Sequence, residues 1–150
     1  MLNAVSSRPR RERTFAATLI VRACLCLAIM ITGLALRGFG LGLGLPALVV
    51  KYGGSMLWAM MVFFAVTIAA SHLTRRNVAL ISAAIAIGVE FFRLVHAPWL
   101  DAFRLTLPGA LLVGRIFSLG NLLAYGVGIV LGIWLDRLAI SLAIEAPPPR

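Results

Sequence analysis

The sequence predicts an all-α integral membrane protein, a helical bundle of about four transmembrane helices. Of its 150 residues, 61% are hydrophobic, and the mean hydropathy is +1.01. This is more apolar surface than one soluble domain of this size buries. Several apolar runs approach the roughly 20 residues that cross a bilayer, and short basic or glycine-rich segments separate them. The chain length accommodates four such runs in one domain.

The first predicted span covers residues 14–36 and follows a basic cytoplasmic tail, residues 1–13. Arg22 interrupts this run, and a long basic side chain of this kind reaches toward the interface. Because no small-residue cleavage site followed by a soluble domain is evident, we interpret the segment as an uncleaved span. The second span covers about residues 53–70, after a loop rich in glycine that cannot propagate a helix.

The third predicted span covers residues 78–95 and the fourth residues 119–135, where Asp136 and Arg137 mark the water boundary. The transmembrane domain is therefore expected over residues 14–138, followed by a C-terminal tail of residues 139–150.

A short interfacial helix is predicted between the third and fourth spans, in the run WLDAFRLTL. At helical spacing, apolar and charged side chains of this run fall on opposite sides, which is typical of a helix lying in the membrane interface. The apolar side holds Trp99, Leu100, Phe103 and Leu107, and the charged side holds Asp101 and Arg104.

The basic residues predict the orientation, because cytoplasmic loops carry an excess of Arg and Lys. The richer side holds Arg8, Arg10, Arg11, Arg13, Arg75, Arg76, Arg137 and Arg150, and the poorer side holds Arg37, Lys51, Arg104 and Arg115. Both termini are therefore expected in the cytoplasm, and the segment from Glu90 to Asn121 is expected at the outer face.

The formal charge of +9 does not predict nucleic-acid binding, since the arginines are spread over the ends of spans. Membrane lipids with anionic headgroups are the expected partners of these residues. Cys24 and Cys26 point to different faces of a helix, which supports neither a disulfide nor a metal site. No cofactor is expected.

Small residues recur every fourth position in the fourth span, at Ala124, Gly128 and Gly132. This pattern predicts a face on which another helix packs closely. The partner helix belongs either to the same chain or to a second copy, and the oligomeric state stays open. Aromatic residues near the span ends are expected to act as interfacial anchors; they are Trp58, Trp99, Tyr52 and Tyr125.

The polar stretch from Glu90 to Asn121 is the predicted functional site, because charge at membrane depth is costly and often marks function. One interpretation is structural: Glu90 neutralises Arg93 or Arg37, Asp101 pairs with Arg104, and His96 caps a helix. The other interpretation is functional. It places a cationic pocket for a phosphate or carboxylate at the outer interface, formed by Arg93, Arg104 and Arg115 and held in place by Glu90 and Asp101.

Three segments carry a family resemblance: LPALVVKYGGSMLWAMMVFF, EFFRLVHAPWLDAFR and LLVGRIFSLGNLLAYGVGIVLG. In this order they resemble the bacterial membrane family of unknown function numbered 2809 (DUF2809), over about residues 20 to 137. An acidic residue that ends one helix, a later Gly-Arg and a polar residue that opens the last helix are also similar to VanZ-like proteins. The resemblance implies a multi-span protein of the bacterial inner membrane.

The chain departs from the usual pattern of these families, with Arg93 in place of a glutamine and Asn121 in place of an aspartate. This argues against a mechanism that needs a second carboxylate there. The candidate ligand-binding residues are Arg93, Asn121 and six positions that match the family pattern, namely Lys51, Glu90, His96, Asp101, Arg104 and Arg115. Trp99 also matches the family pattern but is not assigned to ligand binding.

The leading hypothesis is therefore a membrane protein that binds an anionic lipid, another envelope component or a partner protein at its outer face. Two alternatives stay open. One is an enzyme acting on a lipid headgroup with Glu90 or His96 as acid or base. The other is a small structural subunit that docks through its glycine face.

Overall fold

The computed structural model describes residues 8–106, 109 and 117–145, and the side chains within residues 15–106, 109 and 117–141. The described part of the chain is helical, which confirms the predicted fold class. Its helices are α1 (Arg8–Phe39), α2 (Ala47–Ala69), α3 (Arg75–Phe92), α4 (Pro98–Leu105) and α6 (Leu119–Glu145).

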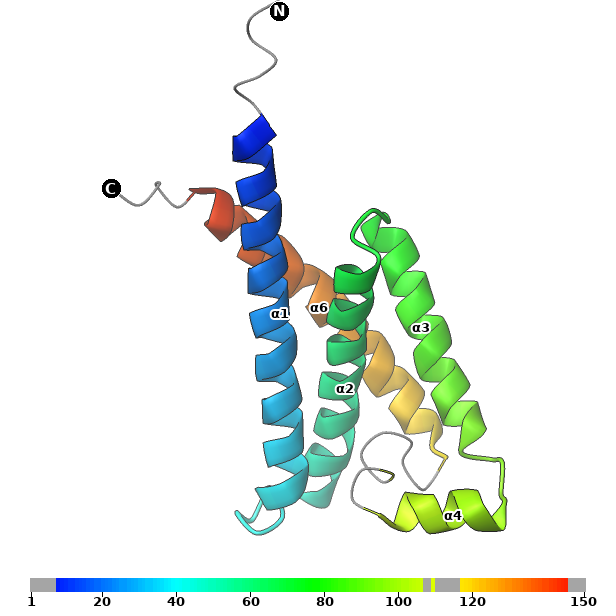
Figure 1. The fold of residues 1–150 in the computed structure, drawn as a ribbon. Coiled ribbons are helices and arrows are strands. Elements are labelled where there is room, and N and C mark those ends of the chain that lie inside the picture. The colour runs from blue at the N-terminus through cyan, green and yellow to red at the C-terminus, as the bar shows by residue number, and fades with distance from the viewer. Residues whose placement is uncertain (1–7, 107–108, 110–116, 146–150) are drawn as a thin grey trace, which may run out of the picture.

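The four long helices run alternately up and down the bundle, so that the start of α1 and the end of α6 lie at the same end (Figure 1). The short helix α4 lies across the opposite end. Helix α2 is central and contacts α1, α3 and α6, while α6 also contacts α1 and α3. The bundle is therefore organised around α2 and α6.

Among the described residues, three helices are long and apolar enough to cross a bilayer, in the segments Phe15–Phe39, Ala47–Ala69 and Leu119–Ser141. By length and composition this is one fewer than the roughly four spans that were predicted. Helix α3 has only 18 residues and includes Arg75, Arg76 and Glu90. It lies along α2 and α6 within the bundle (Figure 1).

The predicted third span was too long at its C-terminal end, because α3 ends at Phe92 and not near Val95. Backbone hydrogen bonds of the i to i+3 type tighten the chain over the next three residues. Pro98 then begins α4, and the residue before it, Ala97, is extended with φ −144° and ψ 142°. A proline disfavours helical backbone in the preceding residue, which explains the break.

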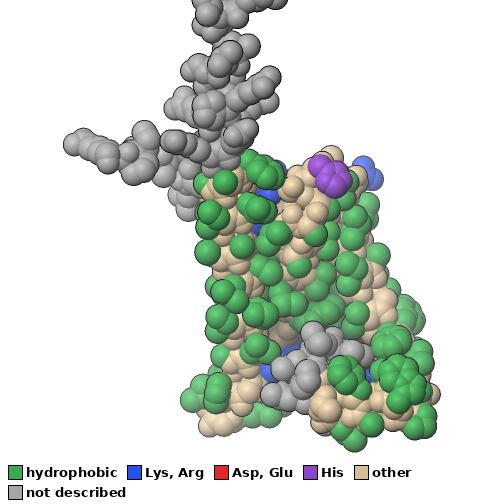
Figure 2. Space-filling model, in the orientation of Figure 1, with side chains coloured by type: hydrophobic (Ala, Val, Ile, Leu, Met, Phe, Trp, Pro, Cys, Tyr) green, Lys and Arg blue, Asp and Glu red, His purple; other side chains and the backbone are tan. Residues whose placement is uncertain are grey.

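The core of the bundle is apolar, with Phe63 and Phe64 of α2 fully buried and their rings 5.6 Å apart. Ala86 of α3 and Ile129 of α6 pack against them. The outer surfaces are also apolar, and hydrophobic side chains cover most of the height of the face shown in Figure 2. An apolar exterior over an apolar core is the composition expected for a bundle in lipid.

The small-residue face of α6 meets α2 of the same chain. A Cβ atom on Gly128 would overlap the carbonyl oxygen of Met56, and one on Gly132 would lie 2.9 Å from Cδ1 of Phe63. Ala124 is partly buried. The absence of side chains at the two glycines therefore allows the close approach of α2 and α6.

Candidate functional site

The Glu90 carboxylate, at the end of α3, is fully buried and accepts four hydrogen bonds. Its Oε1 accepts from the backbone N–H of Ser118 at 2.7 Å and from Nδ2 of Asn121 at 3.0 Å. Its Oε2 accepts from Nη1 of Arg93 at 2.6 Å and from the hydroxyl of Tyr125 at 2.7 Å. Each carboxylate oxygen thus accepts two hydrogen bonds, and these bonds compensate for the loss of water around the buried charge.

Local helix geometry explains part of this arrangement. Glu90 and Arg93 are three residues apart and so share one side of the chain, while Asn121 and Tyr125 are four apart on α6. The end of α3 is thereby joined to the first two turns of α6, across sequence separations of 28 to 35 residues.

Helix α2 contributes a second layer of polar contacts. Oγ of Ser55 lies 3.2 Å from Oδ1 of Asn121 and 3.1 Å from the carbonyl oxygen of Lys51, and it donates to one of them. Nζ of Lys51 lies 3.4 Å from Oγ of Ser118. We call the following residues the Glu90 cluster: Ser55, Glu90, Arg93, Ser118, Asn121 and Tyr125.

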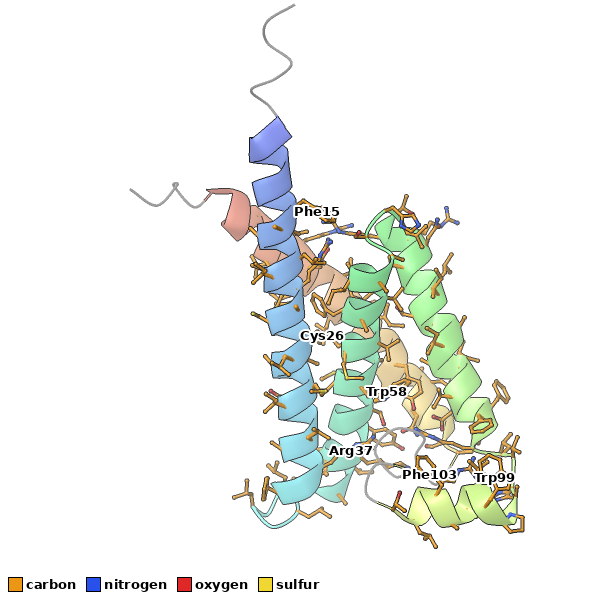
Figure 3. The ribbon with its side chains drawn as sticks, viewed as in Figure 1. Phe15, Cys26, Arg37, Trp58, Trp99 and Phe103 are labelled. Atoms are coloured by element: carbon orange, nitrogen blue, oxygen red, sulfur yellow. The ribbon has the colours of Figure 1, made fainter. Side chains whose placement is uncertain are left out.

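Arg37 approaches this cluster from the end of α1, beside α2 (Figure 3). Its side chain is partly buried and lies against Gly54, where a Cβ atom would come within 2.6 Å of the Arg37 Nε. Arg37 is also near enough to Arg93 for the two positive charges to repel each other. No carboxylate within the described residues forms an ion pair with Arg37.

This end of the bundle therefore holds an excess of positive charge. The pairs Glu90–Arg93 and Asp101–Arg104 are each neutral, and Arg37 and Lys51 leave a net charge of +2 among the described residues at this end. Figure 2 shows basic atoms low on the pictured face, with no acidic atom in view there.

Arg104 is buried and secures α4 to the end of α3. It donates to the carbonyl oxygens of Phe92 at 2.7 Å and Val95 at 2.8 Å, and to Oδ1 of Asp101 at 3.1 Å. Carbonyl groups at the end of a helix lack intrahelical partners, and this guanidinium satisfies them. The predicted local pair of Asp101 and Arg104 is present, and Nδ1 of the exposed His96 lies 3.3 Å from the same Asp101 oxygen.

The structure thus separates the predicted site residues into two groups. Glu90, Arg93 and Asn121 meet in one cluster with Lys51 beside it, whereas His96, Asp101 and Arg104 gather at α4. Arg115 lies outside the described residues.

Tyr125 was predicted to be an interfacial anchor, and this was wrong. Its side chain is 3% exposed, bonded to Glu90, and its ring lies 5.6 Å from that of Trp58. Nothing in the local sequence distinguishes a tyrosine at a lipid interface from one that reaches a buried carboxylate. Ser55, another member of the cluster, was not anticipated either.

The family comparison covers most of this site. A model of the family described as protein of unknown function (DUF2809) matches residues 44–129, more than half of the chain. The chain belongs to the DUF2809 family. No solved structure matches it. The similarity to VanZ-like proteins stays a prediction.

The matched segment of this DUF2809 protein contains the whole Glu90 cluster, Lys51 and α4, but neither Arg37 nor Asp136. Asp136 forms a second polar cluster at the other end of the bundle. Its carboxylate accepts from Nε of Arg22 at 2.7 Å and from Nε of Arg75 at 3.1 Å.

Asp136 was expected at the water boundary, yet its side chain is fully buried. Helix α6 continues to Glu145, and Arg22 in α1 lies opposite Asp136. The sequence did contain a signal for this pair, because it places an arginine in one apolar span and an aspartate in another. Each of these charges needs a partner at membrane depth.

Proposed function

We propose that this DUF2809 protein binds the anionic group of a membrane lipid or of another envelope component, where α1 ends and α6 begins. The observation that carries the proposal is that Arg37, partly buried beside the Glu90 cluster, and Lys51 have no ion-pair partner among the described residues. Arg93 is neutralised by Glu90 at 2.6 Å, which leaves Arg37 and Lys51 for an external anion.

The position of Arg37 favours a lipid headgroup as the source of this anion. Arg37 precedes the end of the apolar segment Phe15–Phe39 by two residues, which is the depth at which headgroups are expected. A guanidinium binds a phosphate or carboxylate through two parallel hydrogen bonds, and the exposed Lys51 adds a compact charge at the same end of the bundle.

The saturation of Glu90 favours binding over catalysis. Four donors already occupy its oxygens, so the carboxylate holds Arg93 and α6 in place and has no free position for a substrate proton. A general acid or base needs such a position.

The layout of the bundle favours binding over transport. Asn121 and Asp136 are 15 residues apart on α6, which corresponds to about 22 Å along a helix. Between the two polar clusters the core is largely apolar and includes Phe63, Phe64 and Ile129. The buried hydroxyls of Thr67 and Ser82 each donate to a carbonyl oxygen of their own helix. A conducted ion or proton needs polar groups along its path.

Our proposal places the protein in the bacterial inner membrane with both termini in the cytoplasm and the anion site facing outward. Two observations support this orientation. The start of α1 and the end of α6 lie at one end of the bundle (Figure 1), and Arg75, Arg76 and Arg137 belong to that same end. An excess of basic residues is typical of the cytoplasmic side.

The proposal is tested by the lipids that the purified protein retains after transfer from nanodiscs of phosphatidylcholine and phosphatidylglycerol, measured by native mass spectrometry. The wild type should retain phosphatidylglycerol selectively, and Arg37→Gln should lower this retention about fivefold.

Arg76→Gln is the matched control, since it removes an exposed charge at the opposite end of the bundle. Equal losses in both variants, or no selectivity in the wild type, would refute a defined site at Arg37.

A further inference from the structure

We infer that the bound group is a phosphomonoester, a doubly charged anion, in preference to a phosphodiester or a carboxylate. This inference rests on the proposed function, because it specifies the charge of the anion bound at Arg37 and Lys51.

The charge count points to a doubly charged ligand. The ion pair of Glu90 and Arg93 is neutral as a unit, with Nη1 and Oε2 2.6 Å apart. Arg37 and Lys51 then contribute +2 with no ion-paired carboxylate in the described part of the chain. A phosphomonoester carries about −1.5 to −2 at neutral pH, whereas a phosphodiester or a carboxylate carries only one negative charge.

The two cations lie at neighbouring positions along α2. Lys51 and Gly54 are three residues apart on α2, so they are neighbours on the same side of this helix. The guanidinium of Arg37 lies over Gly54, and the ammonium of Lys51 lies near Ser118, 5.1 Å from the Tyr52 ring centroid. A single phosphate has three terminal oxygens, enough for the fork of the arginine and for the lysine together.

The Glu90 carboxylate does not oppose an anion at this position. All four of its hydrogen-bond partners are donors, and one of them is the positive Arg93. The negative charge of Glu90 is therefore compensated inside the bundle, whereas Arg37 is partly buried and Lys51 is exposed. The exposure of Lys51 leaves its ammonium accessible to a ligand from outside the bundle.

The test compares nanodiscs of phosphatidylcholine that contain a minor fraction of either phosphatidic acid, a monoester, or phosphatidylglycerol, a diester with the same acyl chains. At about pH 8 the wild type should retain phosphatidic acid about fivefold better, because one additional charge is matched. At about pH 5 the monoester has gained a proton, and the preference should disappear.

Lys51→Gln should remove the preference for phosphatidic acid while phosphatidylglycerol is still retained, and Arg37→Gln should lower the retention of both lipids. Arg76→Gln should keep the preference. Thermal unfolding in detergent shows whether each variant is folded, and Lys51 is exposed enough that its replacement should leave the midpoint unchanged.

A further experiment measures the binding of inorganic phosphate to the protein in nanodiscs of phosphatidylcholine alone, without an anionic lipid. Binding of inorganic phosphate that is lost in Lys51→Gln would support the doubly charged group and assign it to a soluble phosphate. No such binding, with phosphatidic acid retained, would support a lipid as its source.

Equal retention of the two lipids at about pH 8, still dependent on Arg37, would overturn the phosphomonoester and leave the proposed function standing. Retention of neither anionic lipid and no binding of inorganic phosphate would overturn both.

Discussion

Glu90 and Asp136 bring a fully buried carboxylate to each end of the bundle. Each is surrounded by donors from other helices, so the cost of removing the charge from water is offset by several charge-assisted hydrogen bonds. Removing one partner from such a set costs more than the set contributes as a whole, because the remaining charge stays buried without compensation. These two residues are therefore expected to be far more sensitive to substitution than exposed charges.

Glu90→Gln should destabilise the protein by about 3–5 kcal/mol, since the amide group presents hydrogens to two of the four donors and leaves Arg93 without its negative partner. The measurement is thermal and denaturant unfolding in detergent.

Asp101→Asn is the matched control, because the Asp101 carboxylate is 45% exposed and pairs with Arg104 within α4. Its effect should stay below about 1 kcal/mol. A Glu90→Gln protein as stable as the wild type would show that the four hydrogen bonds of Glu90 do not form.

At the residue scale, the sequence predicted the contacts that lie within one or two turns of helix. The pairs of Glu90 with Arg93 and of Asp101 with Arg104 both follow from a spacing of three residues. Arg22 and Asp136 are 114 residues apart, and only the relative placement of α1 and α6 brings them together. Spacing along the chain carries no information on such a contact.

The contact between α2 and α6 depends on the lack of a side chain at Gly128. Gly128→Leu should force the two helices apart at Met56, where even a Cβ atom would overlap the carbonyl oxygen. Unfolding in detergent should therefore occur at a lower midpoint, with a loss of about 2 kcal/mol or more.

Gly126→Leu is a close control in the same helix, because a Cβ atom there would meet nothing within 4 Å. Both changes replace glycine in a helix and gain about the same helix propensity, roughly 0.8–1.0 kcal/mol. The difference between the unfolding midpoints of the two variants therefore reports the effect of packing. Equal midpoints for the two variants would argue against the close α2–α6 contact.

At the element scale, apolar runs and their breaks predicted α1, α2, α4 and α6, with differences at their ends. Hydropathy follows the apolar part of a helix, whereas the helix itself continues into polar residues, so α1 begins at Arg8 and α6 ends at Glu145. The length of α3 was overestimated for the opposite reason: Leu94 and Val95 are apolar but lie in the turns before Pro98.

The whole molecule combines an apolar bundle with two polar clusters that differ in their surroundings. The Asp136 cluster joins α1, α3 and α6 at the end where α1 starts and α6 ends. The Glu90 cluster joins α2, α3 and α6 at the other end, where Arg37 and Lys51 remain without a carboxylate within the described residues. The sequence predicted that polar groups gather at this end of the bundle. It could not predict which of the cations there lack a carboxylate partner, because that depends on the three-dimensional arrangement.

The most direct test of this account is native mass spectrometry of the protein gently extracted from its own membrane, with the double variant Arg37→Gln/Lys51→Gln prepared in parallel. We predict that the wild type carries an anionic molecule, identified by its released mass, that is absent from the folded double variant. The same anionic molecule on both proteins, or none on the wild type, would contradict an anion site at Arg37 and Lys51.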